Sequence, residues 1–290
     1  GVLEGSDLER MDRATRLHTI IGAMRLAYRD RARHLGDPDH VRVDVERLLS
    51  PAYLESLRRE LAAPGGASSR DVQGGTSVAG GRMPGATGTV PSLAGAGANT
   101  THFSIIDRDG NRAAVTLSLN GPFGSGFMPP GTGVLLNNEM DDFVLKPGTA
   151  NLYGLTGSDA NSIAPGKRPL SSMTPTFLET DDKVVVLGTP GGSRIITMVL
   201  LAALDVAHGR GDPLAWVTGP RFHHQFLPDR IEYEPGAFTP DEILALAQHG
   251  HTLVVREEPY GNMQLVVRDK KIHRLEAVSD PRGEGLGRLE

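Results

Sequence analysis

The stretch of residues 64–98 divides the sequence, because it cannot contribute to a hydrophobic core. Gly, Ala, Ser, Thr and Pro dominate it, and almost no large apolar side chain occurs between Pro64 and Val90. A segment of this composition buries too little apolar surface to offset the entropy lost on ordering. The folded structure must therefore form from the segments on either side. The stretch itself is either a flexible tether or a linker between two domains.

The segment before this stretch is predicted to be helical. Apolar residues recur at helical spacing over residues 12–34, and Gly36-Asp37-Pro38 ends the pattern. A second, shorter helix is predicted over residues 51–61. The basic residues of the first helix are interpreted as a face exposed to solvent.

After residue 100 the pattern becomes that of β structure. Two strands, residues 102–107 and 113–119, flank Asp109-Gly110-Asn111 and predict a hairpin. The strand 183–188 leads through a glycine turn into an apolar helix over residues 194–208, which we expect to be buried. A further helix and three closing strands are predicted over residues 240–249, 252–256, 263–267 and 272–275. Because hairpins and helices are mixed without a βαβ rhythm, we expect an antiparallel α+β layered fold.

The composition argues against several classes of protein. The formal net charge of −5 over 290 residues is unlike that of a general nucleic-acid-binding protein. The absence of cysteine rules out disulfides, thiolate nucleophiles and cysteine-based zinc sites. No apolar run reaches the ~20 residues that cross a bilayer, so no membrane association is expected. The N-terminus lacks an initiator Met and the regions of a signal peptide, which suggests a processed chain or part of a longer one.

Thr100 is the first candidate for a chemical role, because it follows the glycine-rich stretch and begins a strand. A threonine hydroxyl is a weak nucleophile unless a base lies beside it, and an N-terminal α-amino group, with a reference pKa of ~8, is such a base. Thr100 would first have to attack the Asn99 carbonyl, so that an N→O acyl shift and ester hydrolysis free the amine. Asn99-Thr100-Thr101 also matches a glycosylation sequon, and Ser/Thr/Asn clusters more often mark turns.

The turn Thr189-Pro190-Gly191-Gly192-Ser193 is a second candidate. Its glycines let backbone N–H groups approach a ligand at the positive end of a helix, which suits an oxyanion hole. A phosphate cradle is the alternative, but neither the Walker lysine nor G-x-G-x-x-G is present. Taken alone, the motif also fits a purely structural turn.

An acidic run over residues 135–143 is a third candidate. Its amide and carboxylate side chains, including those of Glu139 and Asp142, could hold a ligand ammonium group. A metal site is conceivable from Glu139, Asp141 and Asp142, but the alternating oxygen ligands of a calcium loop are absent.

Two further clusters carry polar side chains. Ser171 and Ser172 lie in a proline-bounded loop and could donate hydrogen bonds to a carboxylate, although an ordinary turn is the alternative. His223-His224 suggests zinc. Adjacent histidines on a strand point to opposite faces, however, and no H-E-x-x-H is present, so a structural role is favoured.

Taken in order, these motifs resemble the γ-glutamyltranspeptidase family of N-terminal-nucleophile hydrolases. The resemblance covers essentially all of residues 100–290 and, more loosely, residues 1–63. The stretches that carry it are Tyr28-Arg-Asp-Arg31, Leu35-Gly-Asp-Pro38, Thr100-Thr-His-Phe-Ser-Ile-Ile-Asp107, Leu119-Asn120, Leu135-Leu-Asn-Asn-Glu-Met-Asp-Asp-Phe143, Pro147-Gly148, Asn151-Leu-Tyr-Gly154, Lys167-Arg-Pro-Leu-Ser-Ser-Met173, Pro190-Gly-Gly-Ser-Arg-Ile-Ile196, Pro220-Arg-Phe-His-His-Gln225 and Ser279-Asp-Pro-Arg282.

The resemblance implies an αββα sandwich, with two stacked antiparallel sheets flanked by helices, and self-cleavage between Asn99 and Thr100. Residues 1–63 would form the helical C-terminal part of a large subunit, and residues 64–99 the flexible segment ending at the cleavage site. Residues 100–290 would form the small, catalytic subunit. The implied activity is a γ-glutamyl transferase and hydrolase that cleaves glutathione and other γ-glutamyl compounds, with an amino acid, a peptide or water as acceptor. No cofactor and no metal are expected.

The resemblance also assigns the residues of the reaction itself. Thr100 would be the nucleophile that forms the γ-glutamyl ester. Ser118 stands where the family usually has a second threonine hydroxyl, so the hydroxyl is kept and the methyl group is lost. Gly191 and Gly192 would form the oxyanion hole, and Tyr153 would lie on the loop that closes the pocket.

The donor-binding residues follow from the same resemblance. Asn120, Glu139 and Asp142 would hold the α-ammonium group of the donor. Ser171 and Ser172 would hold its α-carboxylate. Together they would select a substrate that carries both charges of an amino acid.

One departure from the family is large. Its large subunit is much longer than the 99 residues here, and the absent first part should carry part of the sandwich and an arginine that pairs with the substrate carboxylate. We therefore expect a C-terminal portion of a longer protein, which needs the N-terminal part of the large subunit as its partner and is weakly active or inactive alone. Because bacterial members are typically periplasmic or secreted, the same location is expected here.

Two other functions compete with this one. A related acylase that removes cephalosporin or glutaryl side chains would share the fold, but a glutaryl donor has no α-ammonium group for Asp142 to bind. A non-catalytic chain that keeps the fold as an assembly or binding partner is the second alternative. Retention of the nucleophile, oxyanion and binding residues together argues against it.

Overall fold

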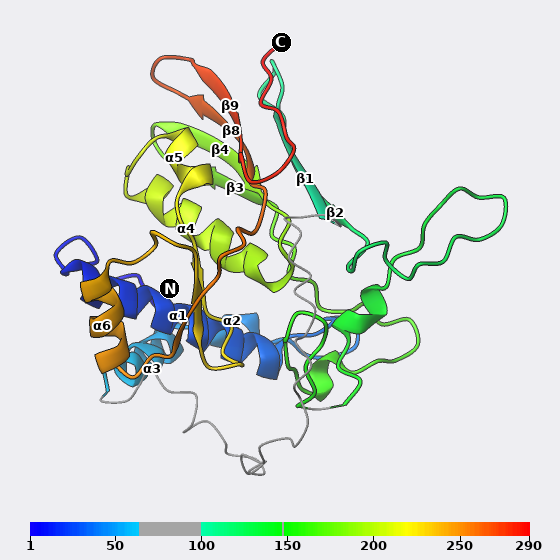
Figure 1. Cartoon of the computed structure of the whole chain (residues 1–290), viewed down its shortest axis with the longest axis horizontal. Coiled ribbons are helices and arrows are strands. Elements are labelled where there is room, and N and C mark those ends of the chain that lie inside the picture. Colours follow the sequence, from blue (N-terminus) through cyan, green and yellow to red (C-terminus); the bar gives the residue numbers. More distant parts are fainter. Residues whose placement is uncertain (64–99, 147) are drawn as a thin grey trace.

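The computed structural model describes residues 1–63, 100–146 and 148–290 as stacked layers of helices and sheets (Figure 1). At the centre lies a four-stranded antiparallel sheet with the strand order β3-β4-β8-β9. Helices α4 and α5 cover one face of this sheet, and the antiparallel hairpin β1-β2 packs against the other. These elements are β1 (Thr100–Ile106), β2 (Arg112–Ser118), β3 (Thr176–Glu179), β4 (Lys183–Gly188), α4 (Ile195–Ala207), α5 (Pro213–Thr218), β8 (Gln264–Asp269) and β9 (Leu275–Ser279).

Strand β4 is covered on both faces, because it lies between α4 and the hairpin. Its residues Val184 to Leu187 are each at most 3% exposed. An unbroken apolar run of this kind is typical of a strand buried on both sides. Val185 and Leu187 face the core that α4 and α5 form, whereas Gly188 faces the hairpin. The predicted strand, hairpin and buried apolar helix are confirmed.

The hairpin contacts β4 through His102. The ring is buried, with Nδ1 2.7 Å from Thr116 Oγ1 and Nε2 3.0 Å from Ser104 Oγ. Burial lowers the pKa of His102 to about 4, so the ring is neutral near pH 7. It fills the space over Gly188, where an added Cβ would lie only 2.2 Å from the ring. The hairpin can approach the sheet this closely because residue 188 has no side chain.

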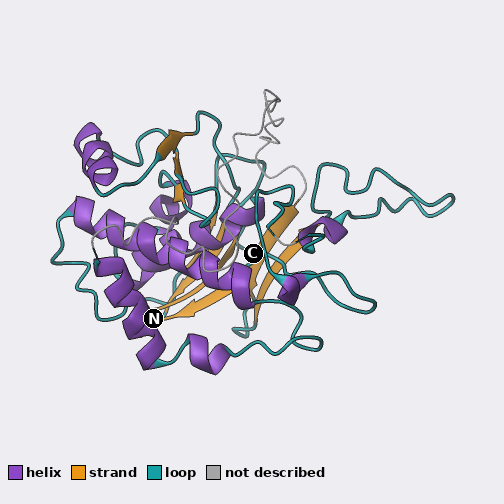
Figure 2. Cartoon of the chain, turned by 90° about the horizontal axis from the view of Figure 1, so that it is seen from below, coloured by secondary structure: helices purple, strands orange, loops and turns teal. Residues whose placement is uncertain are grey.

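The N-terminal helices form a second layer against α4 (Figure 1). Seen from below, the helices lie in front of the strands (Figure 2). Apolar residues of α1 pack with α6 and with a small sheet of strand order β5-β6-β7. Helix α3 packs on another side of α1 through Leu57 and Leu61. The elements of this layer are α1 (Arg13–His34), α2 (Val45–Leu48), α3 (Pro51–Ala62), β5 (Phe222–His223), β6 (Ile231–Tyr233), α6 (Pro240–Gln248) and β7 (Leu253–Val255).

The prediction that the basic residues of α1 face solvent is wrong for two arginines. Arg25 is 1% exposed and Arg29 is 6% exposed. Helix α1 is enclosed by α3, by α6 and by the loops that follow β2, so basic side chains are buried with it. Arg29 Nη1 pairs with Glu60 Oε1 of α3 at 2.5 Å, which compensates its charge.

The predicted closing strands also differ from the observed ones. The last strand begins at Leu275 and not at residue 272, because the Asp269 carboxylate accepts hydrogen bonds from the N–H groups of Lys271 and Ile272 at 2.9 and 3.1 Å. These bonds hold residues 270–273 in a turn. Strand β7 does not close the main sheet but pairs in parallel with β6, an exception to the predicted antiparallel arrangement.

The predicted tether 64–99, which includes Asn99 of the expected cleavage site, lies outside the described residues. Over the part of the chain that is described, none of the helices is both long and apolar enough to cross a bilayer.

The substitution Gly188→Ala is expected to push the hairpin away from the main sheet. The added methyl group would overlap the His102 ring, and overpacking of this kind costs about 1–3 kcal/mol of unfolding free energy. Urea unfolding followed by circular dichroism measures the loss. In a His102→Ala background the same substitution should cost much less. An equal cost in both backgrounds would contradict the proposed contact.

Candidate active site

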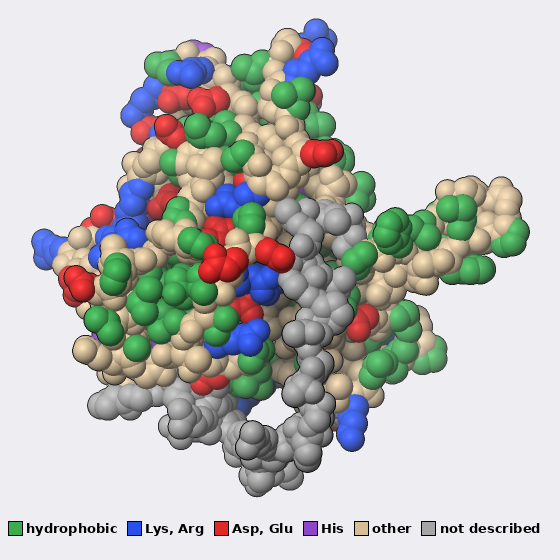
Figure 3. Space-filling view, viewed as in Figure 1, with side chains coloured by type: hydrophobic (Ala, Val, Ile, Leu, Met, Phe, Trp, Pro, Cys, Tyr) green, Lys and Arg blue, Asp and Glu red, His purple; other side chains and the backbone are tan. Residues whose placement is uncertain are grey.

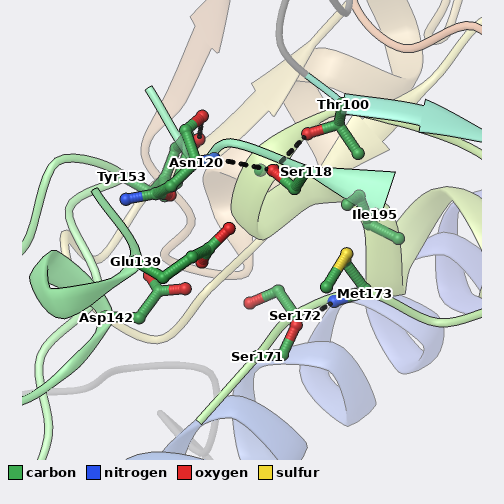
Figure 4. Close-up of a pocket in the computed structure, with 11 residues that line it drawn as sticks. Thr100, Ser118, Asn120, Glu139, Asp142, Tyr153, Ser171, Ser172, Met173 and Ile195 are labelled. Carbon is green, nitrogen blue, oxygen red and sulfur yellow. Dashed lines mark hydrogen bonds between the residues drawn. The ribbon is translucent and has the colours of Figure 1, made fainter. Parts of the chain in front are cut away.

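Thr100 and Ser118 lie side by side where the β1-β2 hairpin opens into a cleft (Figure 4). Thr100 begins β1 and pairs in register with Ser118, the last residue of β2. Thr100 Oγ1 is 2.9 Å from Ser118 Oγ, so the two hydroxyls share a hydrogen bond. The backbone N–H of Asn120 donates to Ser118 Oγ at 2.8 Å. Strand pairing therefore brings the predicted nucleophile beside the predicted second hydroxyl.

Asn120 and Tyr153 form the neighbouring part of the cleft. Asn120 adopts a left-handed backbone conformation with φ of 68°, which asparagine tolerates better than most residues. Its buried side chain donates from Nδ2 to Asn138 O at 3.2 Å. The Tyr153 hydroxyl donates to Asn120 O at 2.6 Å. Burial and nearby carboxylates raise the pKa of Tyr153 to about 12, so the phenol keeps its proton.

Glu139 and Asp142 project from the short 3₁₀ helix η2 (Glu139–Asp142) toward the cleft (Figure 4). Asp142 Oδ1 accepts a hydrogen bond from Asn151 Nδ2 at 3.1 Å. Burial, the charge of Glu139 and a hydrogen bond with it raise the pKa of Asp142 to about 7, although the charge of Arg31 opposes this. A carboxyl group whose ionisation is disfavoured by burial and by a neighbouring carboxylate gains from a bound cation.

Ser171 and Ser172 form another wall of the cleft (Figure 4). Ser171 Oγ accepts a hydrogen bond from the N–H of Met173 at 3.0 Å. Ser172 Oγ accepts one from Arg31 Nη2 at 3.0 Å. Because each oxygen accepts from a fixed donor, each hydroxyl proton can be donated to a ligand.

Arg31 of α1 supports this wall and was missed as a site residue by the sequence analysis. Besides Ser172, its Nη2 donates to the carbonyls of Leu170 and Ser171 at 3.2 and 3.3 Å. One guanidinium thus holds the whole loop 170–172. Helical periodicity assigned Arg31 to an exposed face, and its place in Tyr28-Arg-Asp-Arg31 was the available signal.

Gly192 lines the cleft, and Gly191 directly precedes it. The 3₁₀ turn η4 (Gly192–Arg194) runs into α4, so its backbone N–H groups lie at the positive end of a helix. Gly191 and Gly192 have φ angles of 143° and 58°, which side chains disfavour. An added Cβ on Gly192 would lie 2.4 Å from the Tyr153 ring. Gly191 itself is not among the residues that line the cleft.

The cleft brings together nine of the ten predicted site residues that the structure describes. It holds about 300 Å³ of space, its open mouth included, which suits a small polar ligand. Met173 and Ile195 add an apolar lining that the sequence analysis missed, because both resemble ordinary core positions. The lining residues are Thr100, Ser118, Asn120, Glu139, Asp142, Tyr153, Ser171, Ser172, Met173, Gly192 and Ile195.

The candidate zinc histidines make contacts of a different kind. His223 Nδ1 lies 2.8 Å from Thr197 Oγ1, and His224 Nε2 lies 3.2 Å from Asp229 Oδ1. Both rings are buried. Within residues 1–63, 100–146 and 148–290, no three His, Asp or Glu side chains are placed to share a metal ion. These contacts support a structural role for the two histidines.

Sequence comparisons place these features in a known family. The sequence model of the γ-glutamyltranspeptidase family matches residues 1–288. The glutathione hydrolase proenzyme of Escherichia coli (strain K12) is 38% identical over 284 residues, which are 97% of this chain and 46% of that protein. The proenzyme of Pseudomonas sp. (strain A14) is 43% identical over 243 residues, which are 83% of this chain and 40% of that protein. The chain therefore spans less than half the length of these relatives.

Solved structures share the layered architecture. The γ-glutamyltranspeptidase from Pseudomonas nitroreducens complexed with L-DON is 46% identical, with a TM-score of 0.60 over 66% of this chain and 99% of that chain. The cephalosporin acylase from Bacillus halodurans is 26% identical, with a TM-score of 0.71 over 95% of this chain and 45% of that chain. The predicted N-terminal-nucleophile hydrolase fold is confirmed. The match over nearly the whole sequence and the identity with these relatives show that the chain belongs to the γ-glutamyltranspeptidase family.

Proposed function

We propose that this chain forms the catalytic part of a γ-glutamyl transferase and hydrolase that cleaves glutathione and other γ-glutamyl compounds. One observation carries the proposal: the Thr100 hydroxyl, bonded to Ser118, opens onto a cleft with carboxylates on one wall and free hydroxyl protons on another. The α-ammonium group of an amino acid is complementary to the carboxylates, and its α-carboxylate is complementary to the hydroxyl protons. The family match over residues 1–288 supports this reading.

The donor would be held by both charges of its glutamyl end. Glu139 and Asp142 would bind the α-ammonium group, and binding would relieve the repulsion between the two carboxyl groups. The hydroxyls of Ser171 and Ser172 would donate to the α-carboxylate. The apolar side chain of Met173 lies at the same cleft and suits the methylene groups between the two ends of the donor.

The reaction would proceed through an ester on Thr100. The free α-amino group of Thr100 takes the hydroxyl proton as Oγ1 attacks the γ-carbonyl carbon of the donor. Backbone N–H groups of the Gly191-Gly192 turn stabilise the negative oxygen that forms. The C–N bond then breaks, and the leaving amine departs with the proton. Water or the amino group of an acceptor attacks the ester and restores the Thr100 hydroxyl.

The free amine requires prior cleavage of the Asn99-Thr100 bond. In this step Thr100 Oγ1 attacks the Asn99 carbonyl, the C–N bond breaks to give an ester and an amine, and water hydrolyses the ester. Ser118 is placed to orient the attacking hydroxyl. Cleavage would give two fragments, residues 1–99 and 100–290; within the first, we propose a helical part, residues 1–63, followed by the segment 64–99. The Pseudomonas nitroreducens chain supports the boundary at residue 100, because nearly all of it aligns with 66% of this chain, the share that residues 100–290 make up.

A partner would cover apolar surface that this chain leaves exposed. The outer face of β1-β2 exposes Phe103, Ile105 and Leu117 at 42 to 56%, and the arm between β2 and η2 exposes Phe123 and Phe127 at 76 and 56%. Figure 3 shows apolar side chains along this arm. Patches of this kind mark interfaces. We propose that the N-terminal part of a large subunit covers them, as the length of the relatives suggests. A periplasmic or secreted location is proposed on the family resemblance.

A cephalosporin or glutaryl acylase is the second candidate, supported by the similarity to the Bacillus halodurans acylase. The cleft itself favours the γ-glutamyl donor. A glutaryl group would leave Glu139 and Asp142 without a cation, and an unpaired polar group of this kind strongly disfavours the substrate that lacks its partner. The same fold can hold either activity, so the acid pair is the deciding feature.

Self-cleavage is expected when residues 1–290 replace the matching portion of the Escherichia coli relative. Intact mass under denaturing conditions should show fragments that meet at Asn99 and Thr100, because the hydroxyl pair is in place to start the acyl shift. Thr100→Ala should stay uncut, and Thr100→Ser should still be cleaved. A wild-type chimera that folds but remains uncut would contradict the role proposed for Thr100.

Donor binding is expected to weaken as the pH falls below about 7. The pKa of Asp142 is raised to about 7 in the free cleft, so the carboxyl must lose a proton before it binds an ammonium group. The KM for a γ-glutamyl anilide should rise by up to about tenfold per pH unit below this value. Asp142→Asn should have a high KM with little pH dependence, whereas Asp159→Asn, at an exposed carboxylate, should behave as wild type. A pH-independent wild-type KM would contradict this assignment.

Deprotonation of Asp142 favours donor binding, but in the free protein it lowers the free energy of unfolding. A raised carboxyl pKa means that the folded state binds a proton that the unfolded state has released between about pH 4 and 7. The unfolding free energy should therefore fall as the pH rises through this window. Asp142→Asn should gain stability relative to wild type over the same window, measured by urea unfolding at several pH values. A constant difference across it would show that the pKa is not raised.

The choice between the two donor classes can be measured directly. Release of aniline from γ-glutamyl and glutaryl anilides should favour the γ-glutamyl compound by kcat/KM in the wild-type chimera. Replacing both Glu139 and Asp142 by their amides should reduce this preference, because the cation site loses its charge. Equal rates for both donors would favour the acylase reading.

A further inference from the structure

Gln225 lies behind the cleft and uses its whole side-chain amide in hydrogen bonds. Oε1 accepts from Ser193 Oγ at 2.7 Å and lies 2.9 Å from His223 Nε2. Nε2 donates to the carbonyls of Tyr153 and Leu227 at 3.0 and 3.2 Å. Because an amide oxygen only accepts, His223 Nε2 must carry the ring proton. Rotation of the Gln225 side chain would therefore break several hydrogen bonds at once.

These bonds join two parts of the proposed site that are far apart in sequence. Ser193 follows Gly192 in the glycine turn, and its carbonyl accepts a hydrogen bond from Tyr28 of α1. Tyr153 lies on the loop after η2, and its ring rests against Gly192. The Tyr153 hydroxyl is fixed to Asn120, while its backbone carbonyl is fixed to Gln225.

His223, which contacts Gln225, is itself held by a buried hydrogen bond. His223 is fully buried, and its Nδ1 lies 2.8 Å from Thr197 Oγ1 on α4. Burial, with the charge of Arg194, lowers the pKa of His223 to about 3, so the ring stays neutral and presents one proton to Gln225. Through His223 and Thr197, Gln225 is thus linked to α4, the helix that follows the glycine turn.

We propose that Gln225 is a positioning residue that couples the Tyr153 loop to the Gly191-Gly192-Ser193 turn. This inference rests on the proposed function, in which the turn stabilises the oxyanion and Tyr153 closes the cleft. When the Tyr153 loop withdraws, Gln225 loses an acceptor and the Ser193 side of the turn loses a constraint. The turn therefore places its N–H groups for the oxyanion only when the Tyr153 loop is closed.

Hydrogen exchange measures this coupling without any activity. In Gln225→Leu, amides of residues 151–155 and of 191–195 should both exchange several-fold faster, while Gln248→Leu, at an exposed position on α6, should change neither. Tyr153→Phe, which removes the bond to Asn120, should speed exchange in the turn when Gln225 is present. The same substitution should add little in the Gln225→Leu background. Additive effects, or an unchanged turn in Gln225→Leu, would overturn the coupling.

Kinetics of the chimera adds a readout that a purely structural role would not move. Gln225→Leu should lower kcat for a γ-glutamyl anilide by about tenfold or more with little change in KM, because the oxyanion turn acts in the transition state. Gln225→Glu keeps the acceptor for Ser193 but opposes the Tyr153 carbonyl, so it should speed exchange mainly in residues 151–155. If Gln225→Leu does not fold, Gln225→Glu is used to test the coupling in its place. Unchanged kcat in an active enzyme would overturn the proposal, whereas an inactive wild type with coupled exchange would count against the proposed function alone.

Discussion

The contact between His102 and Gly188 is the interaction on which the geometry of the site depends. His102 lies two residues after Thr100, and Gly188 lies three residues before Gly191, so one contact fixes the hairpin that carries the hydroxyl pair relative to the glycine turn. The pKa of His102, lowered to about 4 by burial, keeps the ring uncharged near neutral pH. The proposed nucleophile and the helix end therefore keep their relative positions over the pH range in which Asp142 changes its charge.

The acid pair is the opposite kind of interaction, because it works against the stability of the free protein. Burial and the proximity of Glu139 raise the pKa of Asp142, and the charge of Arg31 offsets only part of this. Such sites are typical of ligand-binding positions. A cation that pairs with the carboxylates relieves their unfavourable interaction, and this relief adds to the binding free energy. Arg31 has two effects at once: it holds the serine loop and it moderates the charge of the acid pair. A single helix residue thus links both ends of the proposed donor site.

Much of the site could be predicted from the sequence because its residues stand in short, ordered motifs at the ends of recognisable elements. Thr100 at a strand start and the glycines at a helix start are visible in this way. Arg31 was missed although it stands in the motif Tyr28-Arg-Asp-Arg31, because helical periodicity reports which face is apolar but not which neighbours will cover the polar face. Gln225 was part of a recognised motif, yet its proposed role depends on Tyr153, 72 positions away. The late start of β9 depended on one carboxylate that forms a turn, which strand propensity does not register.

The serine hydroxyls of the cleft each accept a hydrogen bond from a fixed donor, a backbone N–H group or the Arg31 guanidinium. Ser171 and Ser172 accept hydrogen bonds from the N–H of Met173 and from Arg31, so their protons are left for a ligand. Ser118 likewise accepts from the N–H of Asn120, which favours donation of its own proton to Thr100 Oγ1. The Thr100 proton is then free to pass to a base, and the oxygen that remains is already stabilised by one donor. This orientation is set by strand pairing and by the turn at residue 120, before any ligand arrives.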